Sequence, residues 1–560
     1  MESVLNQVLD KDYSPSKNFF SSDLILQSFL KKDLSKEGYS YMSDKLFNVG
    51  KSAAVEMNPL AMDADKNGPV LVKRNFLGQN TDEIKFHPSY WKLMDIAVKT
   101  EMFRAKWEPS LRKKFKNESN RLGFSTGFLY AMSEMGLYCP LCMTDGAARL
   151  INLYCEKADK DRLLKHIYTD DSQELFTGAM FLTEKTGGSD VGANLVTARH
   201  YKDGLYHLNG EKWFCSNANG DIIFVLARTD SSVKGTQGLS IFLVEKHLKD
   251  GSKNPIEIIR IKEKLGVRSM ASAECLLTNT VGKLVGKEFQ GFSIMTDMIN
   301  LSRVYTAMGS LSGSRRAIIE AYQFLNHRKT FGKNAIDHAL IRDKFREIGS
   351  LYVGNFYLVW RAISALDHAE NGNLEEEQLL RILTPMIKKK VSEDGVFLAR
   401  ESMELMGGIG YVEDTVLPRI LRDLVVNPIW EGSGNIMVLD MLRATLKSKG
   451  FEIMTTHIHR SFANSEKHED LLQDLNDLKI LASSLANKER DIIESTSKPL
   501  FEKLTKLYQI SVLLDALNNE NAPWVKPAIV FLKENLSCKN PELRSPLSKT
   551  EISGLISWDY

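Results

Sequence analysis

The segment from Ile429 to Asn435 holds a carboxylate in a setting that suits proton abstraction. Glu431 stands between Trp430 and Gly432, which places its charge near an apolar ring and beside accessible backbone. Apolar surroundings raise the pKa of a carboxyl group, and such a carboxylate can accept the proton of a weakly acidic C–H bond. A carboxylate beside glycine also fits a solvated loop end, so the segment alone leaves both interpretations open.

The run TEKTGGSD at residues 183–190 could bind the polar edge of a ligand. Thr183 and Ser189 place hydroxyl groups at the two ends of this loop, and Gly188 lets a ligand approach the backbone closely. The alternative is a plain turn between two strands. This run on its own does not decide between the two.

The run GEKWFCSN at residues 210–217 could cover a planar ring system. Trp213 and Phe214 are adjacent aromatic residues, and Ser216 adds a hydroxyl group two residues further on. Aromatic pairs of this kind also fill the cores of β domains, and that is the alternative interpretation.

Two motifs in the C-terminal half could contact a phosphate-bearing cofactor. In HRKTFG at residues 327–332, Arg328 could bind a phosphate and Phe331 could cover an apolar surface. In MGGIGY, Gly407 and Gly408 offer backbone without side chains, as a closely approaching cofactor requires. Both motifs also fit charged or glycine-terminated helix ends.

The periodicity of apolar residues divides the chain into four parts that must position these motifs. Residues 1–177 predict an N-terminal extension and a helical domain, and residues 178–283 predict a middle β domain. A 3.6-residue period returns over residues 284–447, and residues 448–560 predict an additional C-terminal helical domain. The expected fold class is α+β, mainly α.

Short runs rich in β-branched and aromatic residues mark the β domain. They include residues 205–208, 222–226, 239–244 and 274–277. We interpret the dipeptides Asp203-Gly204 and Asn209-Gly210 as turns between or beside these strands.

Composition and charge exclude several classes of protein. The 560 residues carry a formal net charge of +2, which gives no general reason to expect a nucleic-acid or membrane partner. No window reaches the run of about 18 apolar residues that a membrane-spanning helix needs. The first twenty residues contain Glu2, Asp10 and Asp12 but no arginine, which argues against a transit or signal peptide and favours the cytoplasm.

Several familiar motifs are absent from the sequence. It contains no His-Glu-x-x-His, Walker A or Gly-x-Gly-x-x-Gly pattern, so a zinc hydrolase, a P-loop enzyme and a Rossmann dehydrogenase are not indicated, and no metal is expected. Six scattered cysteines are too few for a disulfide scaffold. We interpret Cys139 and Cys142, which have redox-type spacing, as two packed thiols.

The order and spacing of the motifs carry more information than any one of them. Along the chain stand Thr-Glu-x-x-Gly-Gly-Ser-Asp (183–190), Gly-x-Lys followed by two aromatics and x-Ser-Asn (210–217), Lys-Leu-Gly-x-Arg (264–268), Arg-Lys-Thr-Phe-Gly (328–332), Gly-Gly-x-Gly-Tyr (407–411) and Trp-Glu-Gly-Ser (430–433). Over about residues 80–445 this series resembles the acyl-CoA dehydrogenase family. Residues 86–88, 139–144, 180–191 and 427–437, with the long N-terminal and extra C-terminal regions, are most similar to its AidB-like (alkylation-response) subgroup.

The resemblance implies a fold and a cofactor. The fold would have an N-terminal helical domain, a central β-barrel or sandwich, a C-terminal four-helix bundle and an extra helical domain. The cofactor would be non-covalent FAD. Thr183, Gly188 and Ser189 would contact its isoalloxazine and pyrophosphate region, and Phe214 and Ser216 would lie along the flavin.

The resemblance also assigns residues further along the chain. Arg328, Phe331 and the backbone at Gly407 and Gly408 would reach the FAD of a neighbouring subunit, which implies a homotetramer built as a dimer of dimers. Ser433 and Asn435 would lie near the adenosine portion. Glu431 aligns with the catalytic base, and Arg303 aligns with a substrate-side arginine.

The implied activity is α,β-dehydrogenation of an acyl-CoA thioester, long-chain or unusual, with an electron-transfer flavoprotein or another acceptor taking the electrons. Members of the family that oxidise nitroalkanes use aspartate at the base position, so Glu431 disfavours that activity. Two departures, Lys185 in place of a common proline and Phe214 in place of the usual tryptophan, suit the AidB-like branch. They weaken the case for ordinary β-oxidation.

Two other functions remain open at this point. An AidB-like, DNA-associated protective flavoprotein would need a basic face, but residues 450–560 hold 13 Lys plus Arg and 16 Asp plus Glu, a net of 13 − 16 = −3. DNA binding is therefore possible but not favoured. A weakly active acyl-CoA-binding regulator of lipid levels is the third hypothesis, and the presence of Glu431 argues mildly against it.

Overall fold

We describe the protein from a computed structural model that covers residues 16–463, 468–519, 522–536, 541–543, 545–548 and 551. Its contacts divide the chain into two units. The first comprises residues 1–342 and 391–432, and the second comprises residues 343–390 and 433–560. Each unit is described by itself. Every helix in the described ranges is either too short or too polar to cross a membrane.

The first unit begins with helices that start at capping side chains. The side chain of Asn18 accepts bonds from the amides of Phe20 and Ser21, and Ser35 Oγ accepts from the amide of Gly38, which satisfies backbone donors that have no helical partner. The helices are α2 (Phe19–Ser22), α3 (Leu24–Asp33), α4 (Lys36–Val55), α5 (Met57–Lys66), α6 (Pro88–Lys99), α7 (Arg104–Trp107), α8 (Pro109–Lys114), α9 (Ser119–Ala131), α10 (Tyr138–Tyr154) and α11 (Lys157–Leu163). Every residue of α9 is buried.

A two-stranded hairpin interrupts these helices. Strand β1 (Val70–Arg74) pairs antiparallel with β2 (Asn80–Lys85). The sequence predicted only irregular segments here, because β2 reads NTDEIK and lacks the apolar alternation that marks a strand.

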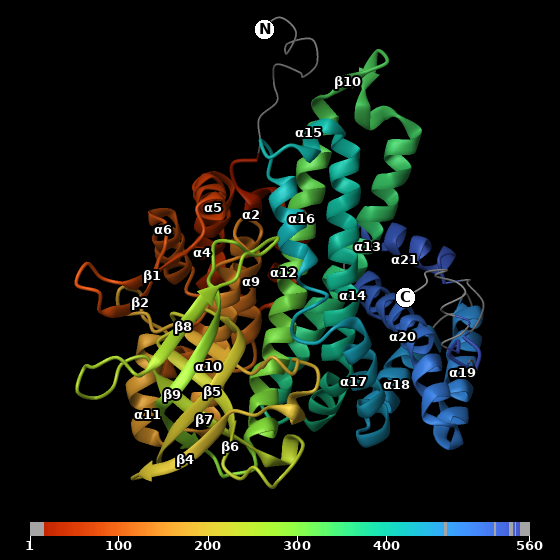
Figure 1. The fold of residues 1–560 in the computed structure, drawn as a ribbon. Helices are drawn as coiled ribbons and strands as arrows, with labels where there is room; N and C mark the ends of the chain where they lie inside the picture. Colours follow the sequence, from red (N-terminus) through yellow and green to blue (C-terminus); the bar gives the residue numbers. More distant parts are fainter. Residues whose placement is uncertain are drawn as a thin grey trace, which may run out of the picture. The chain divides into compact units, whose positions relative to one another are not determined.

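The predicted middle β domain contains one seven-stranded sheet. Its strands are β3 (Gly178–Phe181), β4 (Thr197–Lys202), β5 (Leu205–Ser216), β6 (Ile222–Arg228), β7 (Leu239–Glu245), β8 (Ile256–Ile261) and β9 (Ser272–Val285). The order β3-β6-β4-β5-β9-β7 is completed by a β6–β7 pairing, so the sheet closes on itself, and β8 pairs with β9. Figure 1 shows these strands in yellow and green beside α10 and α12 (Gly291–His327), which contact β3 and β7 respectively.

One of the two predicted turn dipeptides is wrong. Asp203 and Gly204 form the turn between β4 and β5, with φ of +47° and +73°. Asn209 and Gly210 instead lie inside β5, where the register against β9 shifts between Leu208 and Gly210. Gly210 has φ +133°, and a Cβ there would lie 2.9 Å from a side-chain atom of Val196, so glycine serves a strand irregularity and close packing.

The helical segments that follow the sheet supply the rest of the first unit and the whole of the second. After α12 come the short hairpin of β10 (Lys329–Thr330) and β11 (Lys333–Asn334), then α13 (Ala339–Glu370), α14 (Leu374–Met406), α15 (Gly408–Tyr411), α16 (Leu417–Val425) and α17 (Gly434–Lys447). The last helices are α18 (Gly450–Ala463), α19 (Glu469–Ser484), α20 (Arg490–Asn519) and α21 (Val525–Glu534). The expected α+β, mainly helical fold class is confirmed, whereas the predicted domain boundaries stay predictions.

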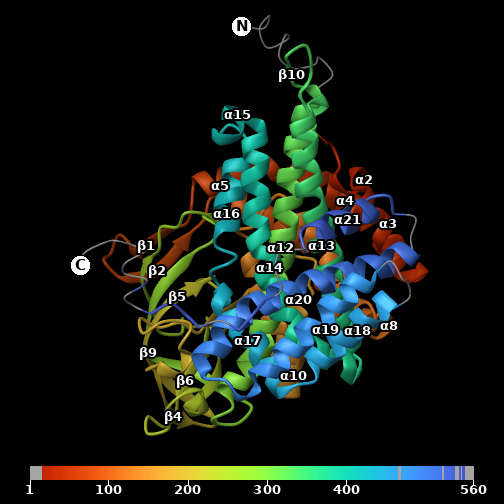
Figure 2. The ribbon, with the colours of Figure 1, turned by 90° about the vertical axis from the view of Figure 1, so that its right-hand side faces the viewer.

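In the second unit, α20 is the central helix. It contacts α17, α18, α19 and α21, as Figure 2 shows for the blue helices. Leu471, Leu475 and Leu478 of α19 are buried, as their repeated spacing predicts. Within the same unit, Gln509 Nε2 donates to Asn355 Oδ1 at 2.9 Å.

Candidate active site

Glu431 lies in the turn that follows α16, in a backbone conformation that few residues other than glycine adopt. Its φ is +55°, and Gly432 follows with φ +99°. Arg303 of α12, 9% exposed, donates from Nε to the carbonyl oxygen of Glu431 at 3.1 Å. Its Nη1 donates to Asn300 Oδ1 at 3.1 Å. The arginine predicted to be on the substrate side therefore fixes the turn that presents the carboxylate, and strained backbone of this kind is frequent at functional sites.

The carboxylate of Glu431 borders a cleft that is mostly lined by apolar side chains. The cleft has a cavity volume of about 30 Å³ and is lined by Met135, Tyr138, Cys139, Cys142, Met143, Val267, Tyr305, Thr306, Gly309, Asn427, Trp430 and Glu431. Its mostly apolar lining with a few polar groups suits an apolar chain that ends in a polar group.

The two thiols of the Cys-x-x-Cys motif lie in the wall of this cleft. Both are free and buried. Burial raises the pKa of Cys139 to about 12, and the nearby charge of Glu431 adds to this rise. The pKa of Cys142 is raised for the same reasons, by burial first and then by its charged neighbours. Thiols with such pKa values stay protonated near neutral pH, so the motif contributes packing and not redox chemistry.

A buried polar cluster holds Tyr305, another residue of the cleft wall. Tyr305 Oη donates to Asp145 Oδ2 at 2.7 Å, and Lys106 Nζ lies 2.5 Å from the same oxygen. Trp107 Nε1 donates to Asp145 Oδ1 at 2.6 Å. Lys106 is 4% exposed and Asp145 is fully buried, so both charges are neutralised within the cluster. Sequence reasoning missed this cluster, because its members lie up to 199 residues apart.

The loop at residues 183–190 is anchored by a buried ion pair beneath it. Lys212 Nζ lies 2.7 Å from Glu184 Oε1, with exposed fractions of 0% and 5%. The two Glu184 oxygens also accept from the amides of Leu195 at 2.5 Å and Val196 at 3.2 Å. Burial lowers the pKa of Lys212, and Glu184 opposes that shift. The pair fixes the base of the loop, whereas Gly188 and Ser189 stay exposed.

Two aromatic residues, Trp213 and Phe214, lie beside this loop. The Trp213 amide donates to the Thr183 carbonyl at 2.9 Å, and Phe214 is 55% exposed although it lies inside β5. Lys262 Nζ lies 3.8 Å from the Trp213 ring centroid and 4.5 Å from that of Phe214. Ser216 Oγ lies 3.3 Å from Ser272 Oγ.

These residues fit a planar, hydrogen-bonding cofactor such as FAD. The exposed Phe214 ring offers an apolar face, and a Cβ at Gly188 would lie 3.0 Å from Thr183 Oγ1, so glycine keeps that hydroxyl group accessible. Buried Oδ1 atoms of Asn217 and Asn219, close in sequence to Ser216, have no hydrogen-bond partner within the described residues. Unpaired buried polar atoms are rare and call for a ligand or water.

The two parts of the site are joined by a short stretch of chain. Ser272 pairs with Ser216 at the start of β9, and the preceding residues 264–270 run back to the cleft, where Val267 is part of the wall. We call residues 264–270 the bridge segment. It contains the predicted Lys-Leu-Gly-x-Arg motif, to which sequence reasoning gave no role.

The remaining predicted cofactor residues lie elsewhere. Arg328 and Phe331 lie just beyond α12, and Phe331 is 98% exposed with φ +48°. Gly407 and Gly408 follow α14, and a Cβ on either would meet no atom within 4 Å. Figures 1 and 2 show β10 and α15 at one end of α12, whereas the seven-stranded sheet flanks the other end. We call residues 328–334 and 407–411 the distal end of the first unit.

The last two predicted residues begin α17 in the second unit. Ser433 is the N-cap of this helix and Asn435 lies in its first turn; both are exposed. They follow Glu431 directly in the chain.

Comparison with known proteins gives, for three stretches of the chain, the family that the sequence motifs resemble. Family models match for the adaptive response protein AidB N-terminal domain (residues 9–171), the acyl-CoA dehydrogenase middle domain (179–280) and the acyl-CoA dehydrogenase C-terminal domain (290–446). AidB of Escherichia coli K12 is 33% identical over 457 residues, which are 80% of this chain and 81% of that protein.

Solved structures agree with these matches. The crystal structure of Caenorhabditis elegans ACDH-11 in complex with C11-CoA has a TM-score of 0.89 and 26% identity, and covers 98% of this chain and 97% of its own. That of Bacillus anthracis acyl-CoA dehydrogenase complexed with FAD has a TM-score of 0.70 and 18% identity, over 93% and 90%, and supports the fold alone.

Proposed function

Because the chain belongs to the acyl-CoA dehydrogenase family, whose members are FAD-dependent oxidoreductases, we propose that it dehydrogenates the α and β carbons of an acyl-CoA thioester. The observation that carries this proposal is the presentation of Glu431 in a mostly apolar cleft. The carboxylate removes the α proton and becomes a neutral carboxyl group. The α proton is acidic enough for this step because the anion delocalises onto the thioester carbonyl.

FAD would be held by Thr183, Gly188, Ser189, Phe214 and Ser216 and would supply a hydride acceptor for the β carbon, with an electron-transfer flavoprotein or another acceptor as the proposed destination of the electrons. The protein's own part is to position the base and to limit the access of water to it. The bond from Arg303 to the Glu431 carbonyl fixes the turn, and the apolar walls limit water around the carboxylate. The first feature fixes the backbone of the base, and the second gives the half-buried Glu431 a mostly apolar setting.

The proposed substrate is an acyl-CoA of medium to long chain. The cleft walls offer methionine, tyrosine and cysteine side chains for an acyl chain, and the relative ACDH-11 was crystallised with C11-CoA. Its apolar lining supports a hydrocarbon chain over a charged one.

An anaerobic titration tests this function. The purified protein should show an oxidised flavin spectrum, and acyl-CoAs of increasing length should be added without oxygen. Bleaching of the flavin, strongest for medium or long chains, is the expected result. If no chain length bleaches the flavin although binding is detected by calorimetry, the protein is an acyl-CoA-binding regulator and not a dehydrogenase.

We further propose that the distal end completes the cofactor site of a second copy, in a homotetramer built as a dimer of dimers. Arg328, Phe331, Gly407 and Gly408 are separated from the flavin-side residues along α12, and the almost fully exposed Phe331 suits a surface that another chain covers. Light scattering on the purified protein should give a mass of four chains. A monomeric FAD-containing protein would contradict this assembly.

A further inference from the structure

We propose that Asp423 is a positioning residue that holds the bridge segment, residues 264–270, in the form that completes the cleft beside Glu431. This inference rests on the proposed function for its consequence in turnover, but the contacts that carry it do not depend on substrate. Asp423 lies at the end of α16, eight residues before Glu431, so one short stretch of chain carries both carboxylates.

The contact at the centre of this inference joins a carboxylate to a strained amide. The amide of Val267 donates to Asp423 Oδ1 at 2.5 Å, and the two residues are 4% and 3% exposed. Val267 has φ +47°, a conformation that is a marked outlier for a β-branched residue. Such backbone persists only where surrounding contacts enforce it. The hydrogen bond from the Val267 amide to Asp423 directly stabilises this strained conformation.

The bridge segment is packed so that it has little room to move. A Cβ at Gly266 would lie 2.2 Å from the Arg422 carbonyl oxygen, which shows backbone against backbone between the segment and α16. Lys264 Nζ donates to the Met270 carbonyl at 2.6 Å, which closes the segment on itself. Ser269 Oγ donates to Glu134 Oε1 at 2.7 Å, and glycine at position 136 is needed for this approach, because a Cβ there would lie 2.0 Å from Ser269 Oγ.

The inner face of the segment forms part of the site. Val267 and Met270 pack with Cys139 in one apolar cluster, and Trp430, adjacent to Glu431, packs against it. Release of Val267 would therefore loosen the cleft wall beside Glu431, to which Trp430 and Cys139 also belong. The same release would be transmitted to Ser272, whose hydroxyl faces Ser216 on the flavin side.

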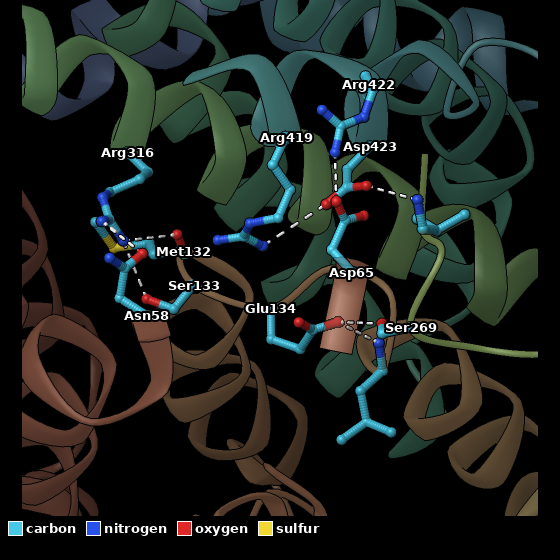
Figure 3. A network of polar contacts seen from close by, with 12 residues as sticks. Asn58, Asp65, Met132, Ser133, Glu134, Ser269, Arg316, Arg419, Arg422 and Asp423 are labelled. Carbon is cyan, nitrogen blue, oxygen red and sulfur yellow. Dashed lines mark hydrogen bonds and ion pairs between the residues drawn. The ribbon is translucent and has the colours of Figure 1, made fainter. Parts of the chain in front are cut away.

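Figure 3 shows the charged surroundings of Asp423. Arg419 Nη1 lies 3.8 Å from Asp423 Oδ2, and the Nε and Nη2 atoms of Arg419, itself 4% exposed, have no hydrogen-bond partner within the described residues. Arg422 pairs with Asp65 of α5. Glu134 lies between α9 and α10, and Lys264 reaches the cluster from the bridge segment itself. Three carboxyl groups thus share this interior with two guanidinium groups and one buried amine.

These closely placed buried charges make the contact between Asp423 and Val267 sensitive to pH. Burial raises the pKa of Asp423 to about 7, Arg419 opposes the rise, and Asp65 and Glu134 add to it. Burial also raises the pKa of Glu134 and lowers that of Lys264 to about 8. Because burial in the held conformation raises the pKa of Asp423, ionisation favours conformations in which this carboxylate is solvated, so the segment should be held most firmly below about pH 7 and loosen as Asp423 loses its proton.

Alkylation of Cys139 provides a readout that does not depend on turnover. Holoprotein with Asp423→Ala, Asp423→Asn or the control Asp414→Asn should be treated with iodoacetamide between pH 6 and 8.5, and labelling quantified by peptide mass spectrometry. Asp414 is an exposed aspartate nine residues earlier in the chain. Cys155, which is half-buried, serves as the internal reference.

Asp423→Ala should label at Cys139 about tenfold faster than Asp414→Asn, the factor expected from loss of one hydrogen bond to a charged group. The side-chain oxygen of Asp423→Asn can still accept the hydrogen bond from Val267. In this variant the rate of Cys139 labelling, normalised to that of Cys155, should lie between the rates of Asp414→Asn and Asp423→Ala. It should also show no change near pH 7. The flavin absorption band should shift in Asp423→Ala, and kcat should fall more than KM rises.

A second substitution separates positioning from general damage. Val267→Gly removes the strain at this position, since glycine adopts positive φ readily. Because Val267→Gly also removes the side chain that packs against Cys139, its readout is the flavin absorption band, which should return towards that of the control when Val267→Gly is added to Asp423→Ala. Equal Cys139 labelling and flavin spectra in Asp423→Ala, Asp423→Asn and Asp414→Asn would overturn the inference, even if no acyl-CoA reduces the wild-type flavin. Should Asp423→Ala not fold, the pH profile of Asp423→Asn decides alone.

Discussion

The cleft beside Glu431 and the distal end of the first unit differ in what surrounds their strained residues. Glu431 has φ +55°, accepts a hydrogen bond at its carbonyl oxygen from Arg303, and lies in a mostly apolar cleft whose wall includes the buried Cys139. Phe331 has φ +48° and is 98% exposed. The contacts that fix the first region come from within one chain, whereas the second presents an apolar side chain that the described residues leave uncovered. The difference shows that the turn of the base is fixed within the single chain, and it supports the proposal that a second copy covers the distal end.

The largest effect is expected on the flavin side of the site, where a buried charge loses its partner. Lys212→Met leaves the carboxyl group of Glu184 buried without its ion-pair partner, which should lower the free energy of unfolding by about 3–5 kcal/mol. Denaturant unfolding of the holoprotein measures this loss. Lys185→Met is the matched control in the same loop, since Lys185 pairs with Glu211 where both are well exposed and should change stability by less than about 1 kcal/mol. Equal effects would show that the loop is not anchored by the buried pair.

An intermediate effect should appear in the pH dependence of stability. Cys139 has a pKa of about 12 in the folded chain and about 8.5 when unfolded, so the folded chain keeps this proton where the unfolded chain releases it. Its contribution to stability is present below pH 8.5 and falls as pH rises towards 12, by about 1.4 kcal/mol per pH unit.

Cys139→Ser should remove that slope between pH 9 and 11. Urea unfolding of both proteins at several pH values, with the slopes compared, provides the measurement. The described residues of the distal end contain no cysteine, so the distal end should add no comparable pH dependence to the free energy of unfolding. Parallel curves for the two proteins would mean that Cys139 is not shielded as the structure indicates.

The smallest effect on stability is expected at the distal end. Phe331→Ala removes a side chain that is 98% exposed among the described residues, so the free energy of unfolding should change by less than about 0.5 kcal/mol. FAD retention on gel filtration and the mass from light scattering should nevertheless fall. Phe76→Ala, which truncates a 95% exposed phenylalanine in the loop between β1 and β2, is the matched control and should leave both unchanged. Identical behaviour of the two variants would remove the distinction between the regions.

Local signals predicted much of the fold. The turn at Asp203-Gly204 and the spaced leucines of α19 both depend on a few neighbouring residues, and the structure confirms each. The same reasoning failed where one signal serves two conformations. Asn209-Gly210 resembles a turn but lies at a strand irregularity.

Contacts between distant residues escaped the sequence entirely. Asp423 and Val267 are separated by 156 positions, and Tyr305 and Asp145 by 160. Nothing in the local pattern distinguishes these residues from solvated ones, because their roles arise only when the chain folds. In the sequence, Glu184 stood out only as part of a motif. The structure shows that it pairs with Lys212, which lies 28 positions later, and this pair explains why the motif contains a glutamate. The candidate base was predicted from its turn, but the residues that hold it were not.

The central claim is that Glu431 removes the substrate's α proton, and one comparison tests it most directly. Wild-type protein and Glu431→Gln should be mixed anaerobically with a saturating medium- or long-chain acyl-CoA, and flavin reduction followed at 450 nm. We predict that Glu431→Gln binds the acyl-CoA but reduces its flavin about 10²–10⁴-fold more slowly, the usual contribution of a general base. Reduction of Glu431→Gln at the wild-type rate would contradict the account and move the base to another residue.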